Sequence, residues 1–220
     1  MLINRLLYPI VISVIFISCS SVKYQPKYQL SDDTYVFKQK GVEPIKVFMD
    51  VKEDTFEILT LSKEPLKLKD GKDAYFIKKS LDVDVLTILF KFRPSQKALP
   101  RQLNTNFNGN VFVGYRIDRF RIHYKKTLAG LQKELHHSGL TVGGFGGFGA
   151  ATINPWTTNN QTTDEYDGFV LTRGLAVMVA VNQLTIGLAT GWDYLTDRDK
   201  NIWIYQNKPW FGVTLSLNVN

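Results

Sequence analysis

The C-terminal part of the chain alternates between large apolar and small residues in three consecutive segments. In residues 169–181 the odd positions are mostly Phe, Leu and Val, and the even positions are mostly Gly, Ala and Thr. Residues 184–195 and 209–218 repeat this scheme. A period of two residues is typical of β-strands, because successive side chains point to opposite faces of a sheet. The three segments therefore predict an all-β, antiparallel protein.

The sizes of the side chains distinguish two kinds of barrel. A soluble barrel encloses its large apolar residues and exposes polar, often charged ones. Here the face opposite the large residues is Gly, Ala, Thr, Ser and Asn, which suits a narrow lumen, so the large face is expected to meet lipid. Arg173 lies on that large face and would have to reach the headgroups. The predicted membrane-facing residues are Phe169, Leu171, Leu175, Val177, Val179, Leu184, Ile186, Leu188, Phe211, Val213, Leu215 and Leu217.

Counting back from the C-terminus predicts an up-and-down transmembrane β-barrel of about eight strands. Short turns at Asn182-Gln183 and Leu81-Asp82 would face the periplasm, and the longer Asn154–Asp167 loop would lie outside. Eight strands leave an interior filled by side chains, so no open diffusion pore is expected. We expect Trp192, Trp203 and Trp210 at the outer rim, where indole rings favour the membrane interface. The predicted strands are Thr55–Leu61, Asp73–Ser80, Val83–Arg93, Leu103–Ile117, Gly139–Ala151, Phe169–Val181, Leu184–Leu195 and Pro209–Asn218.

Two segments allow more than one structure. Thr127–Leu135 has its leucines at helical spacing, but it also fits a hairpin that turns at Ala129-Gly130. Thr141–Ala151 contains five glycines, which suit either a strand that passes close to its neighbours or a mobile loop. Its spacing does not match a phosphate-binding loop, which needs a Lys-Ser/Thr pair.

The N-terminus predicts export. Arg5 precedes an apolar stretch of about a dozen residues, which is shorter than the roughly 20 that a spanning helix needs and fits a signal peptide. The stretch ends at Ser18-Cys19, which resembles a bacterial lipobox and predicts lipidation of Cys19; cleavage as an ordinary signal peptide is the alternative. The expected division is residues 1–18 as signal peptide, 19–43 as a tether and 44–220 as the barrel domain. Residues 44–54 are allowed to form an extra non-membrane strand and turn.

Composition excludes several classes of protein. Hydrophobic residues make up 44% of the chain and charged residues 21%, which is not the composition of a disordered segment. With Cys19 as the single cysteine, neither an intramolecular disulfide nor a cysteine-based zinc site can form. The net charge is +7, but an exported chain without a basic groove motif is not expected to bind nucleic acid. No metal or cofactor is indicated, and the expected partners are outer-membrane lipid and lipopolysaccharide.

Five segments of residues 80–220 resemble the small outer-membrane β-barrel proteins of Bacteroidetes. The resemblance implies a fold and a location, and no catalytic residues, because it carries no activity with it. The terminal Asn218-Val219-Asn220 departs from the aromatic C-terminus of many proteobacterial barrels. The segments are Leu99–Gly109, Tyr115–Asp118, Ala151–Trp156, Gly191–Tyr194 and Ile202–Trp210.

Candidate chemistry is sparse, and enzymatic activity is not expected. His136 and Ser138 would share a face of a strand, with Glu134 one step further along it. This arrangement is similar to the His-activated serine of outer-membrane lipid A deacylases and keeps a lipid-modifying hydrolase open as an alternative. Asp82 and Asp84 also share a face, as an acid pair or a cation site would. We expect instead that they are solvated or neutralised by the nearby Lys78 and Lys79. A further alternative is a soluble periplasmic or surface lipoprotein whose barrel binds a hydrophobic ligand.

Overall fold

The computed structural model describes residues 27–52, 55–69, 71–96, 99–128, 130–182 and 184–217. This part of the chain is all-β with antiparallel pairing, and its only helices are the 3-10 turns η1 (Trp156–Thr158) and η2 (Arg198–Asn201). The predicted signal peptide and Cys19 lie outside the described residues. The strands are β1 (Asp33–Gln39), β2 (Val42–Lys52), β3 (Thr55–Thr60), β4 (Ala74–Arg93), β5 (Gln102–Asn104), β6 (Asn108–Thr127), β7 (Gly130–Ile153), β8 (Tyr166–Val181), β9 (Leu184–Leu195) and β10 (Pro209–Leu217).

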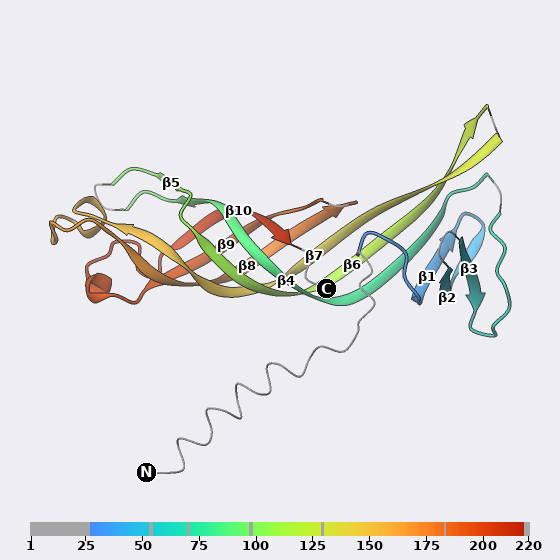
Figure 1. The fold of residues 1–220 in the computed structure, drawn as a ribbon, viewed down its shortest axis with the longest axis horizontal. Coiled ribbons are helices and arrows are strands. Elements are labelled where there is room, and N and C mark those ends of the chain that lie inside the picture. The colour runs from blue at the N-terminus through green and yellow to red at the C-terminus, as the bar shows by residue number, and fades with distance from the viewer. Residues whose placement is uncertain are drawn as a thin grey trace, which may run out of the picture.

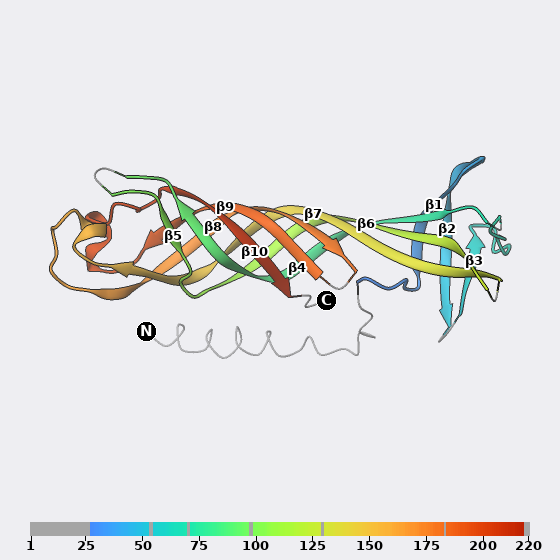
Figure 2. The same ribbon diagram turned by 90° about the horizontal axis from the view of Figure 1, so that it is seen from above.

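Six strands pair in a ring. From β6 onward each ring strand pairs with the next along the chain, while β6 also pairs with β4. The last strand, β10, then pairs with residues 85–92 of β4, which returns the hydrogen bonding to the strand where it began. Figures 1 and 2 show these strands wound around one another along the long axis of the molecule.

A smaller sheet extends from one end of the ring. The strands β4, β6 and β7 continue past the ring, and β1 pairs with residues 74–77 of β4, followed by β2 and then β3 (Figure 1). We call β1–β3, with the parts of β4 and β6 that pack on them, the extension. Its core is apolar and separate from the ring interior. The core contains Leu30, Tyr35, Phe37, Val47, Met49, Ile58, Ala74, Phe76, Phe120 and Ile122.

The opposite end of the ring, which we call the loop end, carries η1, η2 and the long connections between strands (Figure 1). These connections pack on one another around an apolar cluster of their own, which fixes them over the end of the ring. That cluster contains Ala151, Ile153, Val170, Leu195, Trp203, Ile204 and Tyr205.

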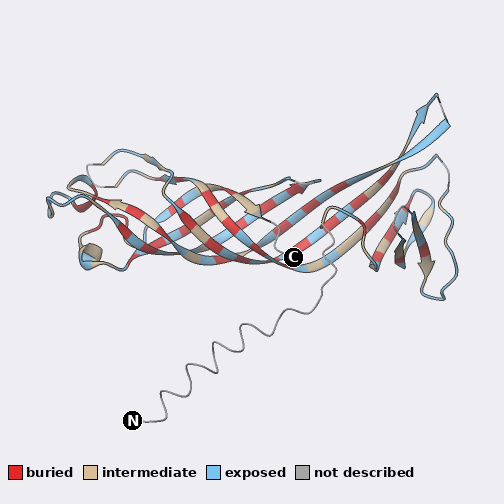
Figure 3. Cartoon of the chain, in the orientation of Figure 1, coloured by how far each residue is buried: buried red, intermediate tan, exposed pale blue. Residues whose placement is uncertain are grey.

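Burial in the ring alternates with the residue type. Val177 and Leu188 are 46% and 70% exposed, whereas Ala176 is 2% exposed and Thr214 is fully buried. Figure 3 shows the resulting bands of buried and exposed residues along each ring strand. The predicted outward residues of β8 and β9, and Phe211, are exposed, while Val213 and Leu215 of β10 are partly buried. The large apolar side chains thus point away from the ring axis, in the orientation that their sizes predict.

Inward glycines allow this close winding. A Cβ at Gly143 would lie 2.2 Å from the carbonyl oxygen of Val113, and one at Gly174 would lie 2.2 Å from that of Thr190 and 2.6 Å from the ring of Phe145. Such contacts are too short for any side chain. The glycine-rich segment is therefore a strand that passes close to its neighbours, as one of the two interpretations predicts, and it lies within β7.

The strand count differs from the prediction. Residues 74–93 form one strand, β4, without the predicted turn at Leu81-Asp82, because the alternation continues there: Leu81 is exposed and Asp82 and Asp84 are buried. The change of phase that follows, toward Lys91, comes from a bulge opposite Val213 and Thr214. The ring accordingly has six strands where about eight were predicted, and the predicted strand at residues 55–61 belongs to the extension.

Two further segments differ from the expected arrangement. The predicted strands leave residues 118–137 as a connection, but these residues complete a hairpin of β6 and β7 in which Thr127 pairs with Gly130. Thr127–Leu135 thus forms the hairpin and not the helix. The expected tether, residues 19–43, is partly folded, because β1 lies within it and pairs with both β2 and β4. The predicted bounds of β9 agree with the structure, and those of β8 and β10 differ by a few residues at most.

Candidate functional site

The candidate catalytic residues lie together on β7 without forming a catalytic arrangement. Glu134 Oε2 lies 3.7 Å from His136 Nε2, but both His136 and Ser138 are exposed, on the outer face of the strand. Among the described residues no hydrogen bond joins His136 to Ser138. A nucleophilic serine needs its base within hydrogen-bond reach and a site that excludes water. The geometry therefore gives no support to a hydrolase.

Two of the three predicted rim tryptophans are buried. Trp192 is exposed on β9, but Trp203 lies in the loop-end core and Trp210 is fully buried inside the ring. The prediction is wrong for Trp210 because its position has the inward phase of β10. Neighbouring glycines leave space for the indole, since a Cβ at Gly191 would lie 2.6 Å from its ring.

The ring interior next to the extension holds a cluster of charged side chains, which we call the lower cluster. Arg116 Nε donates to both carboxylate oxygens of Asp118 at 2.9 Å, and its Nη1 donates to Asp82 at 3.3 Å. His137 Nε2 lies 2.6 Å from Asp118 Oδ1. All four side chains are at most 6% exposed. Buried charges are tolerated only when they are paired, so this cluster fixes the register of β4, β6 and β7.

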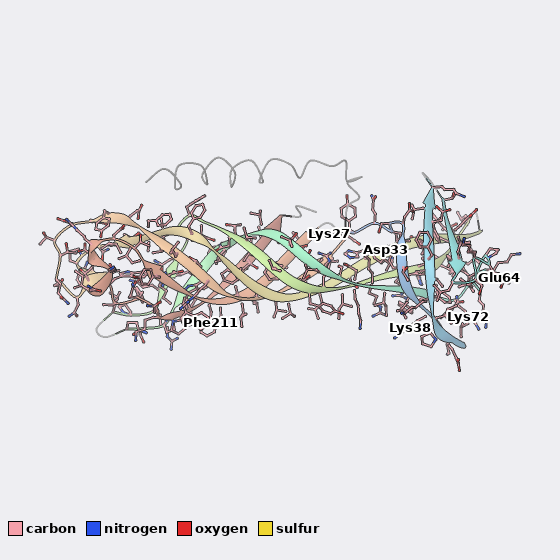
Figure 4. All side chains as sticks on the ribbon, turned by 90° about the horizontal axis from the view of Figure 1, so that it is seen from below. Lys27, Asp33, Lys38, Glu64, Lys72 and Phe211 are labelled. Carbon is pink, nitrogen blue, oxygen red and sulfur yellow. The ribbon has the colours of Figure 1, made fainter. Side chains whose placement is uncertain are left out.

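The lower cluster also binds the N-terminal side of the chain. Lys27 Nζ donates to Asp82, and to Asp84 Oδ1 at 2.7 Å. Figure 4 shows Lys27 between the ring strands and the extension. The expected neutralisation by Lys78 is wrong, because the continuous β4 places Lys78 beside Asp33, 2.6 Å away, instead of beside the two buried acids. Three carboxylates, Asp82, Asp84 and Asp118, thus face two basic side chains and one imidazole.

A second group, the upper cluster, lies near the loop end. Lys91 Nζ donates to both oxygens of Asp193 at 3.0 and 3.1 Å, Arg93 donates to the same carboxylate, and Thr172 donates at 2.8 Å. The guanidinium of Arg93 lies 5.0 Å from the ring centre of Tyr205. Burial raises the pKa of the Tyr205 phenol, so this ring stays neutral beside the cation.

An apolar layer separates the two clusters. Buried aromatic and aliphatic side chains fill the ring between Asp84 and Lys91 of β4 and between the corresponding parts of the other strands. Interior side chains already fill the lumen of an eight-stranded barrel, and a six-stranded ring is narrower still. Large apolar side chains therefore occupy the ring axis between the two charged clusters. The layer contains Leu86, Ile88, Phe112, Phe145, Ala176, Met178, Ala189 and Trp210.

Among the described residues, one small cavity adjoins the charged side chains near the loop end. A cavity of about 10 Å³ adjoins the upper cluster, beside Arg93, Asn104 and Tyr205. A cavity of this size is about the smallest that can hold one water molecule. No group of three or more His, Cys, Asp or Glu side chains that suits a metal ion occurs among the described residues. In the same part of the chain, neither helix has the length and hydrophobicity for a membrane crossing.

Sequence reasoning missed both clusters, although one signal was present. Asp193 is the single charged residue on the small, inward face of its segment, which demands a buried cation on a nearby strand. Lys91 and Arg93 could not be assigned to it because the bulge in β4 shifts their phase. Lys27 lies in a segment whose course the sequence pattern does not determine. Comparisons of the chain with protein-family models, with curated proteins and with solved structures find no match.

Proposed function

We propose that the chain is an outer-membrane β-barrel whose six-stranded ring crosses the bilayer without an open pore. In this proposal the ring serves as an anchor with a structural or lipid-binding role, and the extension lies on the periplasmic side. Outer-membrane lipid, including lipopolysaccharide, is the partner that it implies. The signal peptide and the lipidation of Cys19 are separate predictions from the sequence, and they agree with this location.

The outer face of the ring carries the proposal. Large apolar side chains cover it on every ring strand, while the charged side chains of the two clusters are buried inside. A soluble monomer rarely exposes contiguous apolar patches larger than a few hundred Å². A bilayer reverses this preference, because its hydrocarbon solvates apolar groups and excludes charged ones. The exposed residues include Val85, Phe92, Val113, Val142, Phe148, Phe169, Leu171, Leu175, Val179, Ile186 and Leu188.

Exposed aromatic side chains at the loop end also support the proposed membrane insertion. Exposed aromatic side chains gather toward the loop end, where Phe148 stacks on Phe169 at 5.9 Å and Trp192 and Tyr194 follow on β9. Aromatic girdles of this kind lie at membrane interfaces. Phe211 of β10 belongs to the same face (Figure 4). The alternative of a soluble carrier is less well supported, since packed aromatic and aliphatic side chains occupy the ring interior where a hydrophobic ligand would lie.

A pair of matched substitutions tests the proposal. Leu188 lies on the ring, and Leu61 directly follows β3 of the extension; they are 70% and 71% exposed. Leu188→Arg should reduce the folded, membrane-inserted fraction, because an arginine on the lipid face costs about 2–4 kcal/mol at the bilayer midplane. Leu61→Arg should have no effect. The readouts are resistance to alkaline carbonate extraction and faster gel mobility before boiling. Release of the wild-type protein by carbonate, or equal behaviour of the two variants, would contradict the proposal.

A further inference from the structure

An open groove of about 820 Å³ runs along the outer wall of the ring. Its floor is Gly144 and Gly146 of β7. Its walls follow from the strand register: Gly146 pairs with Val111 on β6 and with Arg173 on β8, while Gly144 pairs with Val113 and Leu175. Trp192 of β9 pairs with Arg173 and continues the wall, and Asn207 contributes at the edge.

Packing does not explain the glycines of the floor. A Cβ at Gly146 would meet nothing closer than 3.9 Å, and one at Gly144 nothing closer than 3.6 Å, which are ordinary van der Waals distances. By contrast, a Cβ at the inward Gly147 of the same strand would lie 2.2 Å from the oxygen of Gly109. Glycine inside a strand costs about 0.5–1 kcal/mol relative to alanine. The structural effect of Gly144 and Gly146 is to leave the groove open.

Arg173 gives the groove one charge. Its side chain is exposed on the outer face, and no ion pair or hydrogen bond to another described residue holds it. The other wall residues are apolar apart from Asn207. A cation at such a position in a bilayer is costly unless an anion neutralises it. A phosphate is the fitting anion, because the planar guanidinium donates two parallel hydrogen bonds to it.

We propose that this groove binds one acyl chain of an anionic glycerophospholipid, with the lipid phosphate on Arg173. One cation and one apolar groove match one phosphate and one chain, whereas lipopolysaccharide presents several of each. Trp192 then lies against the upper part of the chain. This inference rests on the proposed membrane insertion of the ring, and its test separates the two.

Trp192 makes the test direct. Trp203 and Trp210 are buried, so a Trp156→Phe background leaves Trp192 as the lipid-accessible tryptophan. Bromine atoms on a lipid acyl chain quench tryptophan on contact. We expect brominated phosphatidylglycerol, as a minor component of phosphatidylcholine bilayers, to quench Trp192 with about a fivefold preference over brominated phosphatidylcholine. This corresponds to the interaction of one arginine with an anionic headgroup.

Substitutions at Gly146, Gly144 and Arg173 test whether the headgroup preference arises in the groove. Gly146→Val fills the groove and should abolish it, and Gly144→Val is the second variant should the first fail to insert. Arg173→Gln should also abolish it, whereas Arg173→Lys should retain most of it. Gly109→Val is the matched control: it lies on the same outer face, a Cβ there has no neighbour within 4 Å, and it does not line the groove.

The outcomes distinguish the two proposals. No quenching of Trp192 in bilayers made wholly of brominated phosphatidylcholine would contradict membrane insertion itself. Two results would overturn only the lipid groove, provided that Trp192 is quenched in those bilayers. One is the absence of a headgroup preference in the mixed bilayers, and the other is a preference that Gly146→Val leaves intact. Restoration of fluorescence by lipopolysaccharide at a lower concentration than unlabelled phosphatidylglycerol would also overturn it, because the occupant would be a different lipid.

Discussion

Asp193 is the residue on which the upper cluster depends. It is fully buried and is the carboxylate that faces both Lys91 and Arg93. Its removal leaves two buried cations without a counter-charge, which is more damaging than the net value of the ion pairs.

Asp193→Asn should therefore lower the free energy of unfolding by about 3–5 kcal/mol, although the two side chains are almost the same size. The measurement is urea unfolding in detergent, followed by the loss of the heat-modifiable band. Asp167→Asn is the control, because Asp167 is exposed, and it should change stability by less than about 0.5 kcal/mol. Equal stability of the two variants would mean that the upper cluster is not a structural requirement.

At the scale of the element, β7 carries two kinds of glycine in alternation. Gly147→Ala should destabilise the ring by about 1–3 kcal/mol, because its Cβ would overlap the backbone of β6. Gly146→Ala on the same strand should be neutral or slightly stabilising, since its Cβ has free space. The same urea titration compares them. A larger loss for Gly146→Ala would contradict the assignment of inward and outward faces.

The extension has its own dependence on pH. The hydrogen bond with His123, in which Nδ1 lies 2.7 Å from Asp73 Oδ1, holds the pKa of Asp73 below its usual value; partial burial opposes this shift and Arg121 reinforces it. A lowered carboxyl pKa stabilises the folded state above the unfolded pKa of about 3.9, and the stabilisation is lost as the pH falls through the folded pKa.

Hydrogen exchange at the start of β4 should therefore become faster below about pH 4, after correction for the intrinsic exchange rate. Asp73→Asn should show a smaller change between pH 5 and pH 3, because it lacks this titrating group, while Asp33 beside Lys78 can still titrate. A wild-type change no larger than that of the variant would show that Asp73 does not contribute to the stability of the extension.

The elements differ in how far the sequence predicts them. The alternation predicts strands β8, β9 and β10, because one side of each strand carries mostly large apolar residues and the other mostly small ones along its whole length. The alternation does not identify β4 as one strand, because acidic residues such as Asp82 and Asp84 suggest a turn. Their burial within a strand becomes understandable only with their partners Lys27 and Arg116. Likewise, the pairing of β1 with β4 joins residues that no local pattern relates. Long-range pairing and buried charge, rather than local propensity, account for most of what the sequence left open.

At the scale of the whole molecule, the apolar layer between the two charged clusters determines what can pass through the ring. Reconstituted in a planar bilayer, the protein should give no steady conductance, because Phe112, Phe145 and Trp210 fill the axis. A general-diffusion porin, prepared in the same way, is the positive control. Stepwise, reproducible channels from the wild-type chain would contradict the filled interior.

The way in which β4 shares its edge has a consequence for biogenesis. β1 occupies that edge at residues 74–77, and β10 occupies it at residues 85–92. The first partner precedes β4 along the chain, whereas the second follows it after four other ring strands. Until β10 has been made and paired, residues 85–92 present a row of unpaired amides and carbonyls, which is a hazard for aggregation. A stop codon before residue 209 would leave that edge permanently open.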